Sequence, residues 1–180
     1  MAAGLNIATL RPKSGLTPDE ISRWDETEAC LEEAQKEIRT FSYLMHPPAL
    51  EAHKLVSGMQ QFASGFSDRT GIEVELRLDS RVDQLPFQMQ RTFLRIIQEA
   101  LANVHRHAAA SRVCVDGRIV AGKVHLIIAD DGRGLETKND ATVGRGIRGM
   151  QDRTSQWRGQ MRIRSGSKGT RVHAMWPVPH

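Results

Sequence analysis

Glutamate, asparagine and arginine side chains line up along one predicted helix, over about residues 87–109. Glu99, Asn103 and Arg106 are spaced i, i+4 and i+7, which places them along one edge of that helix. Mg²⁺ accepts an asparagine oxygen, an arginine contacts phosphate oxygens, and a glutamate can orient or deprotonate a nucleophile. The spacing therefore favours a surface that handles magnesium and phosphate. An ordinary amphipathic helix with polar flanks is the alternative for this helix taken alone.

A carboxylate and two glycines end an apolar stretch near the middle of the chain. Asp130 follows the stretch, and Gly132 and Gly134 come at the next alternate positions. Glycines let the backbone approach a flat ligand closely, and a carboxylate accepts a hydrogen bond from an exocyclic amine. The motif favours a base-binding pocket, although acidic glycine turns are common in loops.

A second group of glycines, Gly144, Gly146 and Gly149, opens a predicted helix. Dinucleotide-binding folds have the same spacing directly after the first strand of a βαβ unit, but here it follows a long polar loop. Free N–H groups at a helix start can still bind phosphate. Farther along, Thr170 follows Gly169 at the start of the last predicted strand, where its hydroxyl could join a base pocket.

The helices and strands that must position these residues are predicted from the spacing of apolar residues and from capping and helix-breaking residues. A long helix is expected from Thr17, its N-cap, to about Met45, before Pro47 and Pro48. Further helices are expected at about residues 50–69, 87–109 and 147–157, and strands at about 72–78, 112–120, 123–129, 160–164 and 170–176. Helices first, then strands that alternate and pair with helices, favour an α+β fold, with a break near residues 45–49.

The four motifs together, in this order, resemble the Bergerat ATP-binding fold of histidine kinases, Hsp90-type chaperones, type II topoisomerases and MutL mismatch-repair proteins. Residues 98–108, reading Gln-Glu-Ala-Leu-Ala-Asn-Val-His-Arg-His-Ala, resemble the N box of the sensor histidine kinases that signal to NarL-type regulators. Residues 146–153, reading Gly-Ile-Arg-Gly-Met-Gln-Asp-Arg, resemble their G2 box. The resemblance spans about residues 17–177.

This resemblance implies a two-layer α/β sandwich, a mixed sheet covered by helices on one face, preceded by a long helix of a dimerisation hairpin. Residues 1–46 would be the remnant of that hairpin, and residues 47–180 the catalytic ATP-binding domain. The implied cofactors are ATP and Mg²⁺. Asp130 would hold the adenine amine, Asn103 would bind Mg²⁺, and Glu99 would serve catalysis near the transferred phosphate. The remaining implied contacts are Gly132, Gly134 and Thr170 in the base pocket, Arg106 or His107 on phosphate, and Gly144, Gly146 and Gly149 in the lid.

A histidine kinase needs an acceptor histidine, usually followed by an acidic residue, on the first helix of its hairpin. None of the seven histidines fits this pattern. His46 is the alternative, but it ends the second hairpin helix, and its Leu-His-Pro-Pro context resembles the hinge before the ATP domain. Because residues 1–10 resemble the tail of the first hairpin helix, we expect the acceptor to lie outside this sequence.

The implied function is transfer of the ATP γ-phosphate to that histidine, for relay to an aspartate of a NarL-type response regulator. The full-length kinase is expected to be a homodimer, and this portion is not expected to autophosphorylate alone. The alternative function is an ATP-dependent conformational switch without kinase activity. A serine kinase of the anti-sigma type also shares the motifs, but the long helix before Pro47 argues against it.

Charge is distributed unevenly along the chain, whose net charge is +4. Residues 19–37 hold eight acidic side chains and two basic ones, whereas residues 144–171 hold eight basic and one acidic. A basic surface can bind nucleic acid or a polyphosphate. Of the five Phe, three Trp and one Tyr, only Trp157 lies within the basic run, so we expect no nucleic-acid partner.

No stretch approaches the roughly 18 apolar residues of a membrane helix. We therefore expect no membrane contact by these residues and a cytoplasmic location, whether or not the parent protein is anchored. The two cysteines, Cys30 and Cys114, are too few for a disulfide framework or a zinc site, and both are expected to be buried.

Overall fold

A computed structural model describes residues 15–45, 54–135 and 144–179, and the chain divides into two compact units, Met1–Tyr43 and Leu44–His180. The predictions for residues 1–10 and for His46 lie outside the described residues. Helix α2 (Pro18–Met45), whose last two residues belong to the second unit, begins at a capping box. The Glu20 N–H donates to Thr17 Oγ1 (3.3 Å), and the Thr17 N–H donates to the Glu20 carboxylate (2.8 Å). The predicted N-cap is therefore confirmed.

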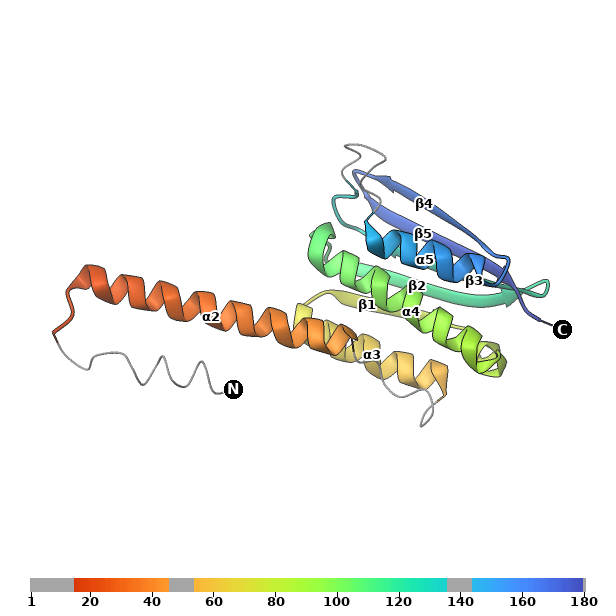
Figure 1. The fold of residues 1–180 in the computed structure, drawn as a ribbon, viewed down its shortest axis with the longest axis horizontal. Coiled ribbons are helices and arrows are strands. Elements are labelled where there is room, and N and C mark those ends of the chain that lie inside the picture. Colours follow the sequence, from red (N-terminus) through yellow and green to blue (C-terminus); the bar gives the residue numbers. More distant parts are fainter. Residues whose placement is uncertain (1–14, 46–53, 136–143, 180) are drawn as a thin grey trace. The chain divides into compact units, whose positions relative to one another are not determined.

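The second unit is a five-stranded mixed sheet with helices over one face (Figure 1). The helices are α3 (Leu55–Thr70), α4 (Phe87–Asn103) and α5 (Arg145–Ser155), and the strands are β1 (Glu73–Leu78), β2 (Arg112–Val120), β3 (Lys123–Asp130), β4 (Gln160–Gly166) and β5 (Gly169–Pro177). The strand order is β1-β2-β3-β5-β4, in which β1 and β2 are parallel and every other pair is antiparallel. The predicted α+β class and two-layer sandwich are confirmed.

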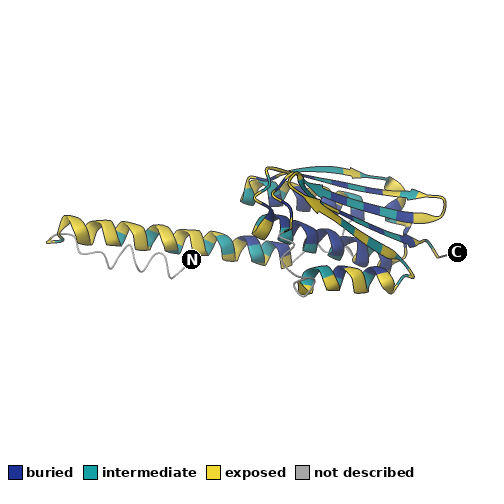
Figure 2. Ribbon diagram, turned by 90° about the horizontal axis from the view of Figure 1, so that it is seen from above, coloured by how far each residue is buried: buried dark blue, intermediate teal, exposed yellow. Residues whose placement is uncertain are grey.

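The core lies between the helices and the inner face of the sheet, because alternate strand residues point inward. On β3 the buried residues are Val124, Leu126 and Ile128. Phe93 of α4 meets Trp176 of β5 edge to face, with ring centroids 6.3 Å apart. Figure 2 shows this buried layer and the largely exposed length of α2. None of the described helices is long and apolar enough to span a membrane.

Local details differ from the expectations at several places. The helix expected over residues 87–109 leaves α-geometry after Asn103 and continues as the π-helical turn η2 (Val104–Ala108), which ends at Ala109 with a left-handed backbone. A short 3-10 helix, η1 (Ser80–Gln84), was not expected, and Asp79 caps it through the Arg81 N–H. Helix α5 begins at Arg145, two residues before its predicted start.

The prediction that both cysteines are buried is wrong. Cys30 is exposed on α2, where most side chains face solvent within the described residues. Cys114 is only half-buried, because it lies between the inward-facing Val113 and Val115 of β2 and so points to the outer face of the sheet.

Candidate nucleotide site

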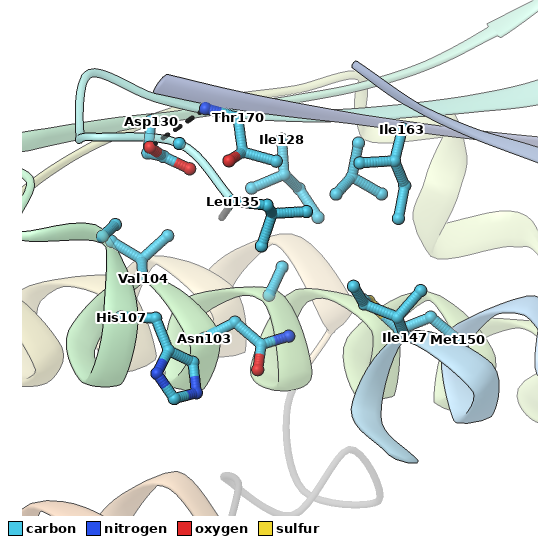
Figure 3. A pocket seen from close by; sticks show the side chains of 14 residues that line it. Asn103, Val104, His107, Ile128, Asp130, Leu135, Ile147, Met150, Ile163 and Thr170 are labelled. Atoms are coloured by element: carbon cyan, nitrogen blue, oxygen red, sulfur yellow. Dashed lines mark hydrogen bonds between the residues drawn. The ribbon is translucent and has the colours of Figure 1, made fainter. Parts of the chain in front are cut away.

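A pocket opens between the helices and the sheet at the end of β3. Most of its lining is apolar, with a few polar groups converging on it, as is usual for small-molecule sites. In Figure 3, Asp130 and Thr170 lie on the sheet side, and Asn103 and His107 come from the helical side. The lining residues are Ala100, Asn103, Val104, His107, Ala108, Ile128, Asp130, Gly134, Leu135, Ile147, Met150, Ile163, Thr170 and Val172.

The Asp130 carboxylate is fixed on the sheet side of the pocket. Its Oδ1 accepts hydrogen bonds from the backbone N–H of Gly132 (3.0 Å) and of Thr170 (3.1 Å). One bond comes from the loop after β3 and the other from the start of β5, so a single oxygen joins both segments. The second oxygen, Oδ2, accepts no hydrogen bond that we find among the described residues. It is therefore the atom suited to accept a hydrogen bond from a ligand amine.

Gly169 makes the close packing around Asp130 possible. Its φ is +109°, and a Cβ at this position would lie 1.9 Å from the Asp130 carbonyl oxygen. No side chain fits there, because both the backbone conformation and the space exclude it. The Gly-Thr pair at the start of β5 thus has a structural reason that the sequence motif did not reveal.

Substitution of Gly169 by alanine is expected to destabilise the second unit strongly. The new methyl group would meet backbone, which cannot move aside without breaking the Thr170-to-Asp130 hydrogen bond. Gly122→Ala is the matched control, because Gly122 also has a positive φ (+70°) but open space around its Cβ position. We expect a loss of about 1 kcal/mol for Gly122→Ala and at least about 2 kcal/mol more for Gly169→Ala, measured by urea unfolding. Equal losses would contradict the steric explanation.

Asp131 has a different task from its neighbour Asp130. Its carboxylate accepts hydrogen bonds from Ser111 Oγ (2.6 Å) and from the backbone N–H groups of Ser111 and Arg112 (2.9 Å each). The Ser111 hydroxyl, and then the backbone donors, lower the pKa of the Asp131 carboxyl. Asp131 points to the start of β2 and is satisfied there, so it is a structural residue. The two adjacent aspartates are the same type of residue but differ in role, because their carboxylates accept hydrogen bonds from different groups.

The helical wall of the pocket is built at the junction of α4 and η2. Asn103 is the last residue of α4, and His107 lies one turn later in η2. Arg106 is exposed and is not among the lining residues. A π-helical turn takes more residues per turn than an α-helix, so Arg106 is rotated farther from the face of Asn103. The structure therefore brings His107, rather than Arg106, beside Asn103.

The loop after β3 is tied to this helical wall. The Arg133 N–H donates to the Ala108 carbonyl (2.8 Å), and Arg133 Nε donates to the His107 carbonyl (2.7 Å). Gly132 lies so close that a Cβ would meet the Ala108 carbonyl oxygen at 2.3 Å. These contacts fix the distance between the two walls of the pocket on this side.

Glu99 lies one turn before Asn103 and faces the start of α5. A Cβ on Gly146 would lie 1.9 Å from Glu99 Oε1, so the carboxylate packs directly on this glycine. Gly144 is the N-cap residue of α5 and has open space around its Cβ position, whereas a Cβ on Gly149 would meet the Arg153 guanidinium at 2.7 Å. Neither Glu99 nor these three glycines line the pocket itself. They lie beside the pocket, where α4 meets the start of α5.

Several residues that line the pocket or lie beside it were missed from the sequence. Ile147 and Met150 follow the glycines of α5 and line the pocket from the helical layer (Figure 3). Ser165, on β4, accepts a hydrogen bond from the Leu135 N–H (2.6 Å), and its Oγ lies 3.1 Å from Thr170 Oγ1. A serine in a strand carries no signal of its own, and only the β4–β5 pairing of Ser165 with Thr170 reveals its place.

The donor set fits a magnesium ion that is bound together with a ligand. The described residues contain no group of three His, Cys, Asp or Glu side chains that could hold a metal ion. Asn103 offers one neutral oxygen ligand. Mg²⁺ is often bound through one or two protein oxygens, with substrate phosphates and water completing its octahedron.

Several characterised proteins are similar to this chain in sequence. The chain is 34% identical over 147 residues to the sensor histidine kinase MctS of Rhizobium johnstonii, 28% over 143 residues to the histidine-protein kinase/phosphatase DegS of Brevibacillus brevis, and 29% over 147 residues to the sensor histidine kinase LiaS of Bacillus subtilis. These alignments cover 80%, 79% and 81% of the chain, but 32%, 37% and 40% of the relatives. The chain therefore spans between about a third and two fifths of the length of these relatives.

Solved structures show the same fold. A histidine kinase domain from the blue-light activated kinase of Erythrobacter litoralis aligns with a TM-score of 0.61 at 18% identity, covering 80% of this chain and 74% of that one. The histidine kinase AdeS of Acinetobacter baumannii aligns with a TM-score of 0.55 at 14% identity, covering 98% of this chain and 92% of that one. No protein-family model matches the chain.

Proposed function

Since the chain is a homologue of the sensor histidine kinases, we propose that it is the ATP-binding catalytic portion of such a kinase, which transfers the γ-phosphate of ATP to a histidine outside this chain. The observation that carries the proposal is the pocket itself. It sets a carboxylate with one uncommitted oxygen, Asp130, on one wall and an amide, Asn103, on the other. An apolar slot between two such groups fits a purine with its polyphosphate tail.

In this proposal Asp130 Oδ2 accepts the hydrogen bond of the adenine amine, and Thr170, Gly132 and Gly134 shape the base pocket. Asn103 binds Mg²⁺, which when bound neutralises charge on the phosphates. His107 lies on the phosphate side of the pocket. Arg106, which is exposed, contacts phosphate only if its side chain swings toward the pocket mouth.

Glu99 is the proposed catalytic residue. Phosphoryl transfer requires positioning and charge neutralisation more than covalent help from the protein. A carboxylate at this place can orient the attacking imidazole or take up its proton. The lid glycines Gly144, Gly146 and Gly149 let the start of α5 approach the phosphates.

The partners follow from the same proposal. The acceptor histidine belongs to the dimerisation hairpin of a homodimeric parent kinase, with residues 1–46 as part of that hairpin. From the histidine, the phosphate is relayed to an aspartate of a response regulator of the NarL type. The alternative function is an ATP-dependent conformational switch that binds the nucleotide without transferring phosphate.

Transfer in trans tests the kinase against the switch. The chain is mixed with Mg²⁺, ATP labelled at the γ-phosphate, and a separately expressed dimerisation hairpin from one of the relatives. We expect an acid-labile label on the hairpin, and none when its acceptor histidine is replaced by glutamine. ATP binding by calorimetry without any label on the hairpin would favour the switch instead.

A further inference from the structure

The outer face of the sheet, opposite the helices, carries a cluster of basic side chains that the nucleotide site does not use. We name Arg162, Arg164, Arg171 and His173 the β4–β5 basic cluster; together they line a hollow on this face. Arg162 and Arg164 lie on β4, and Arg171 and His173 on β5. Their inward-facing neighbours, such as Ile163 and Val172, line the nucleotide pocket from the other face. The cluster therefore lies behind the wall of that pocket.

Pairing in the sheet places like charges directly opposite each other. Arg164 faces Arg171 across the β4–β5 ladder, and Arg162 faces His173. Opposite residues of an antiparallel pair have Cβ atoms about 5 Å apart, and residues on the same face of one strand are about 7 Å apart. Like charges opposite each other are unfavourable. The sheet thus concentrates four basic groups in a small rectangle, and the repulsion between them lowers the stability of the sheet.

No acidic side chain among the described residues forms an ion pair with the arginines of this cluster. On the β1–β2 half of the same face, Glu75 pairs with Arg112 (2.8 Å) and Asp116 with Arg118 (3.2 Å). Strands β4 and β5 hold no Asp or Glu, and the sequence has none after Asp152. Among the described residues we find no ion pair of Arg162, Arg164 or Arg171. The cationic charge of this half is therefore open to an anion from outside.

Protection of a sheet edge explains only part of the cluster. Strand β4 is an edge strand, and charged side chains on edge strands prevent pairing with another chain. That role could account for Arg162 and Arg164. Strand β5 lies between β3 and β4, so it has no edge to protect. Arg171 and His173 consequently require another explanation.

His173 stacks on a second histidine inside this environment. The rings of His125 and His173 are 5.5 Å apart, and His125 Nδ1 lies 3.3 Å from His173 Nε2. Burial, and then neighbouring positive charge, lower the pKa of His173. The groups that contribute this charge are His125 on β3, Arg171 on β5, Arg162 on β4 and Arg118 on β2. An anion bound here would reverse this effect, because it favours the protonated imidazole.

We propose that the β4–β5 basic cluster is a second binding site, which takes a compact oligophosphate anion. Arginine forks match phosphate oxygens in bidentate geometry, and three of them lie within one small hollow. The dimensions of the rectangle suit an anion with several charges over a few ångströms. An acidic helix or an extended polymer would spread its charges over a longer distance than these four paired positions span.

Calorimetric titration of the chain with orthophosphate, pyrophosphate and tripolyphosphate, without Mg²⁺, tests the proposal. We expect saturable one-to-one binding of tripolyphosphate, at least about tenfold tighter than orthophosphate, because each added phosphate meets another cationic group. The double substitution Arg164→Ser, Arg171→Ser should weaken it at least about tenfold. Arg77→Ser is the matched control, since it removes an ion-paired arginine from the same face and should leave the affinity within about twofold.

The imidazole provides a second readout. Tripolyphosphate should raise the pKa of His173, followed by NMR of its ring proton, and affinity should increase as the pH falls from about 7.5 to 6, by at most about tenfold per pH unit for one proton. Saturating ADP should not displace the anion, which separates this site from the nucleotide pocket. Displacement by ADP, equal affinities for all three phosphates, or equal effects of the double variant and Arg77→Ser would each overturn the proposal. Binding of polyglutamate without any binding of tripolyphosphate would also overturn it, in favour of an acidic protein partner.

Discussion

Replacement of Glu99 by glutamine is expected to slow phosphoryl transfer to a separate hairpin by about 10²- to 10⁴-fold, with ATP affinity changed by no more than about threefold. Glutamine keeps the shape of the side chain, so its packing on Gly146 is preserved. The neutral amide cannot take up a proton from the attacking imidazole. The effect should therefore appear in the transfer rate, measured under single-turnover conditions, and not in calorimetric binding of Mg-ATP.

A structural role for Glu99 gives a different pattern. A carboxylate beside the first turn of α5 interacts favourably with the helix dipole, typically by about 0.3–1 kcal/mol. If this is its whole task, the substitution lowers the thermal unfolding temperature and leaves the transfer rate within about threefold. Glu73→Gln on the outer face of β1 is the matched control, and it should change neither transfer nor nucleotide binding. Loss of ATP binding in the Glu99 variant would contradict the assignment altogether.

Replacement of Asp130 by asparagine is expected to weaken ATP binding by about 10- to 100-fold, the usual loss of a charge-assisted hydrogen bond of about 1.5–3 kcal/mol. An asparagine oxygen can still accept from the Gly132 and Thr170 N–H groups, so the fold around the site is retained. The amide nitrogen then takes the place of Oδ2. Because that nitrogen is a donor, it faces the donor amine of adenine and cannot bond to it.

Asp131→Asn, at the adjacent position, is the matched control. It removes the same charge one residue away, from a carboxylate that holds Ser111 and Arg112. We expect it to lower stability by about 1 kcal/mol and to leave ATP affinity within about threefold. Since the pKa of Asp131 is lowered in the fold, this stabilisation is present above about pH 4 and is lost as the pH falls through the folded pKa. Equal calorimetric affinity of the wild type and Asp130→Asn for Mg-ATP would contradict the site.

The sequence predicted most elements of the second unit, because its strands alternate cleanly and its helices carry apolar stripes. Prediction failed where the conformation or burial of a residue depends on contacts with residues far away in the sequence, which a local pattern does not show. The turn at η2 depends on the loop after β3, since Arg133 bonds to the carbonyls of His107 and Ala108. Cys30 was expected to be buried as a small hydrophobic residue in a helical pattern, yet most side chains of α2 are exposed among the described residues.

The candidate site divides in the same way. Asp130, the glycines after it and the Glu-Asn helix were predicted from residue type and spacing, and the structure brings Asp130, Gly134 and Asn103 to one pocket. The difference between Asp130 and Asp131 was not, because it depends on which backbone N–H groups each carboxylate meets. Ser165 was likewise hidden, since its role comes from strand pairing with Thr170.

By itself, the sequence determined the fold class, the order of the four motifs and the excess of basic residues near its C-terminus. Only the tertiary structure decided which of these residues meet. It placed Asn103 and Asp130 on opposite walls of one pocket. It also directed alternate side chains of β4 and β5 to the two faces of the sheet. Periodicity of two separates neighbouring residues to opposite sides of a sheet, while the register of pairing decides what each side gathers. That register joins Arg162, Arg164, Arg171 and His173 behind the candidate nucleotide pocket.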